Sequence, residues 1–279
     1  LNGTEFVLTD SSAAGNGQIT GSTTGGIVVE NGKFTMNGGN ITGNTKQGDG
    51  AGVEVKQNGS FVMNDGMIAG NTAYKGIDAN GNYTFGRDTD KTSRGGGVYV
   101  YGKDKEGNKK DKDSFIMHGG VIAGNTAGEG GGVYVNGVKA NGYEPDYRKG
   151  ETSHIRFTMD GGVIYNNTAK AGEGGGIYIA GSEGVISGGA ITGNKTETTK
   201  DLGGGGIYIE HTGKLTLNNA LIIDNTAEGM GGGLASCANG NAAVFAEQGV
   251  AIFDNTANGK PVHTENNAVD GYKVWMNAD

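Results

Sequence analysis

Residues 115–125 read FIMHGGVIAGN, and closely similar segments occur at 34–44 (FTMNGGNITGN), 61–71 (FVMNDGMIAGN) and 157–167 (FTMDGGVIYNN). The last residue of this segment marks a repeat, because an asparagine three positions after an isoleucine returns along the chain at Asn44, Asn71, Asn125, Asn167, Asn194, Asn225 and Asn255. A degenerate first copy ends at Ser22. Successive copies are 27, 54, 42, 27, 31 and 30 residues apart. A period of this length is typical of solenoid proteins.

Each repeat contains three strand-sized segments, for example Val98-Tyr99-Val100, Phe115-Ile116-Met117 and a third segment that holds Ile122. Alternation places the first and third residue of each triplet on one face. Strands that recur without a helical period predict an all-β, right-handed parallel β-helix of about seven to eight three-strand coils, since parallel crossovers are right-handed. We expect one domain over 1–279, with a capping coil at 1–24, repeat coils at 25–259 and a C-terminal cap at 260–279.

Composition narrows the class of protein. The 279 residues include 58 Gly but only 2 Pro, which excludes collagen, and the regularly placed apolar residues argue against disorder. The net charge of −8 argues against nucleic acid as a partner. No run of about 18 apolar residues occurs, so we expect no membrane insertion. Cys237 is the only cysteine, and the chain begins at Leu1 without an apolar leader, as a mature or excised fragment would.

Two short motifs carry a family resemblance. Phe34–Asn37 and Phe61–Asn64 fit FxxN, whereas Gly119–Ile122, Gly161–Ile164 and Gly188–Ile191 fit GGxI. Together they resemble the repeats of chlamydial polymorphic outer-membrane proteins and of adhesin-like β-helix proteins of gut microbes. The resemblance covers nearly the whole chain and implies surface exposure and a binding role. Two departures, Gly184-Val185-Ile186 in place of Phe-x-Met and Glu247 at a Met position, predict weaker core packing there.

The repeated asparagines are the most regular polar feature. We interpret them as a structural ladder, because asparagine tolerates the left-handed conformation of a turn and its amide can bond to the amide one coil away. A second row contains Asp49, Glu129 and Glu173, with Arg94 at the equivalent position of the intervening coil. We expect an alternating acid–arginine stack on the surface and no calcium site, since the calcium-binding nonapeptide is absent.

Evidence for catalysis is sparse. The four histidines, His118, His154, His211 and His263, lack metal-ligand spacing, and no phosphate loop or nucleophile elbow occurs. The middle residues of the first triplets, which should face outward, contain no pair of acids of the kind that glycoside hydrolysis needs. We therefore predict neither an enzyme nor a cofactor or metal; a carbohydrate-active β-helix enzyme remains an alternative by analogy of fold.

Those outward positions instead hold a row of tyrosines in four successive coils: Tyr99, Tyr134, Tyr178 and Tyr208. A self-stacking ladder would account for them without a ligand. Solvent-facing tyrosine is also enriched in binding surfaces, so the row is a candidate binding site as well.

Three insertions lengthen the second to fourth coils, at 73–94, 102–113 and 137–154. The first contains Ile77–Phe85, which reads as a hairpin with an Asn80-Gly81 turn rather than as a hidden coil. The candidate binding residues in the inserts are Arg87, Tyr143, Tyr147 and Arg148. Loops that project from a repeat scaffold commonly carry function.

The sequence therefore predicts a monomeric, secreted or cell-surface bacterial adhesin that binds a host protein, such as an immunoglobulin or mucin, or a glycan. The alternatives are the polysaccharide lyase or hydrolase already mentioned and a structural stalk.

Overall fold

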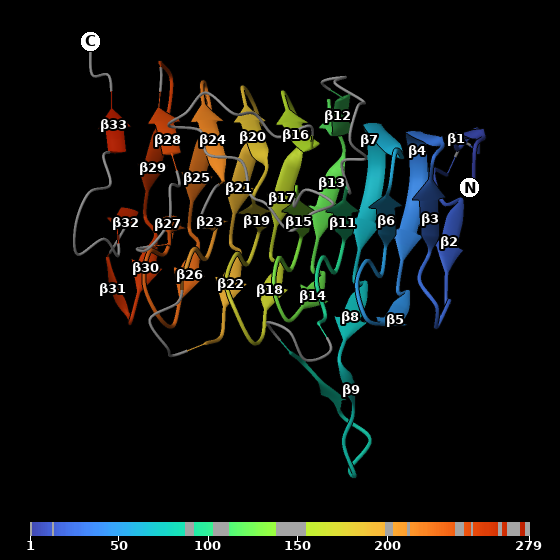
Figure 1. Ribbon diagram of the computed structural model, residues 1–279, viewed down its shortest axis with the longest axis horizontal. Coiled ribbons are helices and arrows are strands. Elements are labelled where there is room, and N and C mark those ends of the chain that lie inside the picture. The colour runs from blue at the N-terminus through green and yellow to red at the C-terminus, as the bar shows by residue number, and fades with distance from the viewer. Residues whose placement is uncertain are drawn as a thin grey trace.

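The computed structural model describes residues 2–12, 14–86, 92–102, 112–137, 155–198, 203–210, 213–237, 243–246, 248–261, 264–266 and 274–276. Over these residues the chain is all-β, and most strands pair in parallel in three long sheets, here called A, B and C. The strands lie side by side along the long axis, with the N-terminal strands at one end and the C-terminal strands at the other (Figure 1). This arrangement is consistent with a parallel β-solenoid. The described residues contain no helix that could cross a membrane.

Sheet A is built from the first triplet of each repeat. Its register aligns Val53, Val98, Val133 and Ile177, so like residues stack on like. Its strands are β3 (Ile27–Glu30), β6 (Val53–Lys56), β11 (Val98–Tyr101), β15 (Val133–Asn136), β19 (Ile177–Ala180), β23 (Ile207–Glu210), β27 (Leu234–Ser236) and β32 (Thr264–Asn266).

Sheet B combines the second and third segments of each repeat. In two repeats these segments merge into the long strands β4 (Lys33–Thr42) and β7 (Ser60–Ala69). The separate second-segment strands are β1 (Glu5–Leu8), β12 (Lys112–Met117), β16 (Ile155–Met159), β20 (Glu183–Ile186), β24 (Lys214–Leu217), β28 (Ala243–Ala246) and β33 (Val274–Met276). The third-segment strands are β2 (Gln18–Thr20), β13 (Val121–Ala123), β17 (Val163–Tyr165), β21 (Ala190–Thr192), β25 (Leu221–Ile223) and β29 (Ala251–Phe253).

Sheet C follows the repeated asparagine and was not expected from the sequence. Its strands are β5 (Thr45–Gln47), β8 (Thr72–Tyr74), β14 (Thr126–Ala127), β18 (Thr168–Ala169), β22 (Lys195–Thr196), β26 (Thr226–Ala227), β30 (Thr256–Ala257) and β31 (Lys260–Pro261). A two-residue strand is too short to show alternation, so only the recurrent threonine–alanine pair could have revealed it. The alanines point inward, and Ala73, Ala127 and Ala169 are fully buried.

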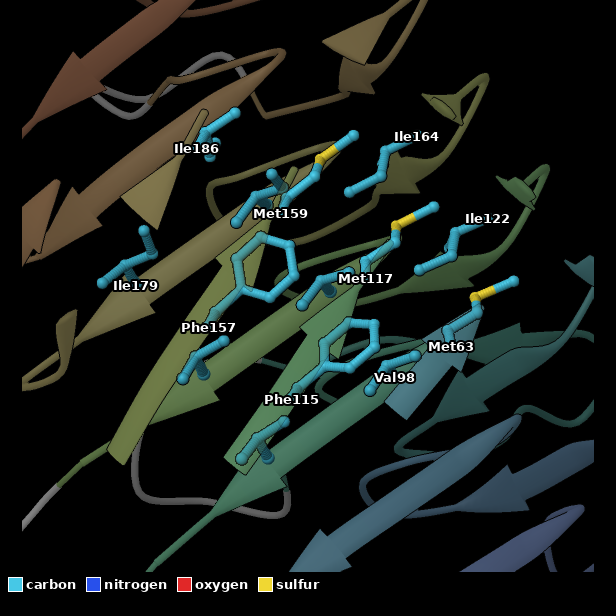
Figure 2. Close-up of a cluster of buried hydrophobic side chains, with 14 of the residues drawn as sticks. Met63, Val98, Phe115, Met117, Ile122, Phe157, Met159, Ile164, Ile179 and Ile186 are labelled. Carbon is cyan, nitrogen blue, oxygen red and sulfur yellow. The ribbon is translucent and has the colours of Figure 1, made fainter. Parts of the chain in front are cut away.

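The core consists of ladders in which identical or similar apolar residues follow one another. Phe34, Phe61, Phe115 and Phe157 are fully buried, and successive ring centroids lie 4.8, 4.8 and 5.0 Å apart. Methionines and isoleucines form parallel ladders beside the phenylalanines (Figure 2). Ile116 and Thr158, between the inward positions, are only half-buried. The predicted inward and outward faces of this segment are therefore confirmed.

The weaker core packing expected at the two departures from the pattern stays a prediction, and the structure shows what lies at each position. Gly184 aligns with Phe157, and the Cδ1 atom of Ile179 lies where a side chain at Gly184 would begin, so that the neighbouring strand fills the space. In the last repeat the residue that aligns with Leu217 is Ala246, which is 8% exposed. Placing Glu247 at that position was wrong by one residue.

The first insert contains a hairpin, as the sequence predicts. Strands β9 (Gly76–Ile77) and β10 (Tyr83–Thr84) are antiparallel, and the Asp78 carboxylate accepts hydrogen bonds from the backbone amides of Asn80 and Asn82 at 2.9 Å. The hairpin projects from the stack of strands (Figure 1). Strand β6 pairs directly with β11, so no further repeat lies between them.

Candidate functional site

The tyrosine row lies on the outer face of sheet A, one residue in each of β11, β15, β19 and β23. The register aligns Tyr99, Tyr134, Tyr178 and Tyr208, and successive ring centroids are 5.7, 4.4 and 5.2 Å apart. The rings form an apolar cluster of their own with Ala180 and Ala235, separate from the main core. The predicted ladder is therefore present, with Tyr134 and Tyr178 stacked and the two outer pairs tilted.

The tyrosines do not face solvent, and that expectation is wrong. Tyr99 is 6% exposed, Tyr134 2%, Tyr178 3% and Tyr208 5%. Burial is the main cause that raises the pKa of all four phenols, so their hydroxyl groups remain protonated. A pleated strand directs alternate side chains away from the interior, but other groups can still cover them. In this conformation the row forms a second core and not an open binding surface.

Arg94 joins the tyrosine row to the neighbouring acids. Its Nε donates to Glu129 Oε2 at 3.1 Å, its guanidinium carbon lies 5.3 Å from the centre of the Tyr134 ring, and its backbone amide donates to Asp49 Oδ1 at 2.8 Å. Burial alone would lower the pKa of Arg94, but the nearby phenol and carboxylates outweigh it and raise the pKa. The predicted order Asp49–Arg94–Glu129 along the stack is confirmed, although the bond from Arg94 to Asp49 comes from its backbone.

The acids in this stack are more buried than a surface row would be. Glu129 is 3% exposed and Glu173 6%. Burial raises the pKa of Asp49, and the positive charge of Arg94 offsets only part of that rise. Over the described residues, no group of three or more His, Cys, Asp or Glu side chains is arranged to hold a metal ion. The expected surface location is wrong for Glu129 and Glu173, which are buried, whereas Asp49 and Arg94 are partly buried.

The asparagine ladder runs through the buried turn between sheets B and C. Asn71 illustrates it: Nδ2 donates to Asn125 Oδ1 and to the carbonyl of Ile41, both at 2.9 Å, and Oδ1 accepts from the backbone and side-chain nitrogens of Asn44 at 3.0 Å. All seven asparagines are 0% exposed. Since the amide of Asn71 already makes four hydrogen bonds, the ladder has a structural role, as interpreted.

Of the two reasons expected for asparagine, the amide bond to the next repeat is confirmed and the left-handed conformation is wrong. The left-handed residue of each turn is the one before the ladder position, for example Gly70 with φ 62° and Gly124 with φ 60°. The ladder residue itself is selected for its two amide donors and its carbonyl acceptor.

None of the four candidate residues predicted in the inserts is among the described residues. Arg87, Tyr143, Tyr147 and Arg148 lie outside the described residues, as do most of the inserts 102–113 and 137–154. The hairpin of the first insert is described: Tyr74 and Tyr83 stack with centroids 4.4 Å apart, and Ile77 is 59% and Tyr83 43% exposed. Sequence analysis identified this hairpin but overlooked its exposed apolar pair, Ile77 and Tyr83, which lie opposite each other on its two strands.

A second feature was overlooked on sheet B. Met67, Tyr165 and Phe253 lie on the outer side of its third-segment strands and are 36%, 38% and 45% exposed. The signal in the sequence was the apolar residue on each side of the repeated isoleucine, which a strand with one solvated face would not need.

These features define an all-β repeat protein with long parallel sheets, a buried asparagine ladder and a covered tyrosine row. The chain matches no protein-family model, no curated protein and no solved structure.

Proposed function

We propose that the chain is an extracellular recognition module of a bacterial surface protein, in which a right-handed β-helix of about seven to eight coils holds projecting segments that bind a host protein or a glycan. The observation that carries this proposal is the β9–β10 hairpin. It leaves the stack of strands and presents Ile77 and Tyr83, both exposed, on a two-stranded element stiffened by the Tyr74–Tyr83 stack.

The exposure of Ile77 and Tyr83 favours a binding role. Exposed apolar and aromatic side chains gain nothing from water, whereas a binding partner can bury them, and tyrosine provides a large contact area with few rotatable bonds. A purely structural stalk has no need for such a hairpin. The ladders beneath it are stiff and fully packed, so a projecting segment would be held in one position for a partner.

The experiment begins with capture of partners from mucosal secretions on immobilised protein, followed by affinity measurement with the purified partner. We expect Ile77→Ser with Tyr83→Ser to weaken binding by about 1–2 kcal/mol or more, as do substitutions at interface hot spots. Tyr143→Ala, Tyr147→Ala and Arg148→Ala should weaken it by a similar amount if the third insert contributes.

Tyr165→Ser is the matched control, because it removes an equally exposed tyrosine from a sheet position. Equal affinity of the hairpin variant and the wild type would exclude the hairpin as the binding site. Turnover of a polysaccharide panel by the wild-type protein would instead favour the carbohydrate-active alternative.

A further inference from the structure

The β9–β10 hairpin leaves the stack of strands after β8, and the chain re-enters the stack before β11 (Figure 1). Both legs meet one turn of the preceding repeat, here called the anchor turn and formed by Gln47, Gly48 and Asp49. On the departing leg, the amide of Gly48 donates to the carbonyl of Tyr74 at 2.9 Å, and Gln47 Nε2 donates to the carbonyl of Lys75 at 3.0 Å. The start of the hairpin is therefore held by two residues of the anchor turn.

On the returning leg the side chain of Asp49 holds two residues. Its Oδ1 accepts a hydrogen bond from the backbone amide of Arg94 at 2.8 Å, and its Oδ2 accepts one from the hydroxyl of Thr92 at 3.2 Å. The amide of Gly50 donates to the carbonyl of Arg94 at 2.9 Å. Gly48 and Gly50 have φ of 111° and 72°, a conformation that residues with a Cβ rarely adopt. The turn that brings the Asp49 carboxylate to the returning leg therefore depends on glycine.

Ser93 connects this contact to the hairpin itself. It lies between Thr92 and Arg94 in the chain and is fully buried. Its hydroxyl donates to the carbonyl of Gly86 at 3.3 Å, and the amide of Gly86 donates to the hydroxyl oxygen at 3.2 Å. Gly86 follows the end of β10 by two residues. A continuous chain of contacts therefore runs from the Asp49 carboxylate to the end of the hairpin.

The charges around Asp49 indicate how it acts. The cations near it are each engaged with another carboxylate, Arg94 with Glu129 at 3.1 Å and Lys46 with Glu54 at 2.7 Å. Burial accordingly raises the pKa of Asp49, and Arg94 offsets only part of that rise. An asparagine side chain has the same shape, accepts through its carbonyl oxygen and can donate to a hydroxyl oxygen through its amide. We therefore expect the contacts of Asp49 to depend on hydrogen-bond geometry and not on its charge.

We propose that Asp49 is a positioning residue, which fixes the β9–β10 hairpin against the stack of strands by binding the returning leg at Thr92 and Arg94. The inference rests on the proposed recognition function, because a hairpin that is already held loses less conformational freedom when a partner binds. Without the Asp49 side chain, the Thr92 hydroxyl and the Arg94 amide lose this acceptor, and the hairpin gains motion about its departing leg.

Nuclear magnetic resonance of the full chain tests the proposal without a partner. The backbone order parameters of residues 76–84 should be close to about 0.85 in the wild type, as in rigid backbone, and should fall below about 0.6 in Asp49→Ala. The amide of Arg94 should exchange with solvent at least about tenfold faster in that variant, because its acceptor is removed. Asp49→Asn should keep both quantities at their wild-type values, because it retains both contacts.

Two further variants separate positioning from a general loss of structure. Glu173→Ala removes a buried carboxylate of the same row that makes no contact with the hairpin legs in the bonds described above, and it should leave the hairpin order parameters unchanged. Ser93→Ala breaks the contact with Gly86, so the order parameters should fall while the Arg94 amide stays protected. Ser93→Ala also tests the proposal should Asp49→Ala fail to fold, which melting curves check.

Equal hairpin order parameters in the wild type and Asp49→Ala would overturn the proposal. A loss of order as large in Glu173→Ala, or in Asp49→Asn, would overturn it as well. Once a partner is purified, Asp49→Ala should weaken binding at least about tenfold and Asp49→Asn should not. Lost hairpin order with unchanged affinity would support Asp49 as the positioning residue and exclude the hairpin as the binding site, so the two proposals can fail separately.

Discussion

Tyr165 in β17 and Tyr178 in β19 both point away from the main core, yet one is 38% exposed and the other 3%. Tyr178 lies on sheet A, stacked 4.4 Å from Tyr134 within a row that Arg94 and buried acids accompany. Tyr165 lies on sheet B between Ala123 and Thr192. A side chain that points outward from a strand is therefore not necessarily exposed to solvent. The groups that lie above each sheet decide which outward face becomes a second core.

The largest loss of stability is expected in the inward phenylalanine ladder. Phe157→Ala should lower the free energy of unfolding by about 3–5 kcal/mol, since it removes a fully buried ring from the stack between Phe115 and Gly184. Thr158→Ala, the adjacent outward position, should cost less than about 1 kcal/mol. Urea denaturation measures both, and equal losses would contradict the assignment of the two faces.

The two tyrosines test the comparison directly. Tyr178→Ala should cost about 3 kcal/mol, as expected for a buried aromatic ring with stacked neighbours. Tyr165→Ala should change the free energy of unfolding by less than about 0.5 kcal/mol, since that ring is partly solvated. Thermal denaturation measures both variants. If their melting temperatures are equal, the outer face of sheet A is not a second core.

The charged residues beside the tyrosine row should contribute less to stability than the tyrosine rings do. Arg94→Met removes the guanidinium that donates to Glu129 and lies over Tyr134, and we expect it to cost about 2 kcal/mol. Adding Glu129→Gln should recover part of the loss, because an amide is less costly to bury than a carboxylate. Strictly additive losses in this double-mutant cycle would mean that the two side chains are not coupled.

Among the buried positions, the smallest loss of stability is expected at Glu183 in β20 of sheet B. Burial alone would raise the pKa of Glu183, but bonds from Lys214 and Arg156 at 2.8 Å outweigh it and lower the pKa below its ordinary value of 4.5. The folded protein then binds fewer protons than the unfolded one. The stabilisation is complete above pH about 4.5 and is lost as the pH falls through the lower folded pKa.

Glu183→Gln should therefore cost about 1 kcal/mol at pH 7 and progressively less below pH 4.5. Denaturation midpoints of the variant and the wild type, compared at several pH values, check this. If the difference between the two midpoints does not become smaller at low pH, the loss of stability comes from packing and not from the charge of Glu183.

Several features could be predicted from the sequence because each depends on short-range patterns. The asparagine landmarks, the phenylalanine and methionine ladders and the β9–β10 hairpin all follow from residue spacing and local turn chemistry. Sheet C could not be predicted this way, because its strands are two or three residues long and carry no alternation. The one-residue error at Ala246 arose where the repeat itself degenerates.

The sequence by itself determined which side chains point inward, because alternation along a strand is a property of the chain. Only the tertiary structure decided which outward side chains are covered, because coverage depends on segments distant in sequence. Tyr178 is buried beside Tyr134 and Tyr208, which come from neighbouring repeats, and Glu129 is buried against Arg94 from another repeat. Tyr165 lies between the smaller residues Ala123 and Thr192 and remains 38% exposed.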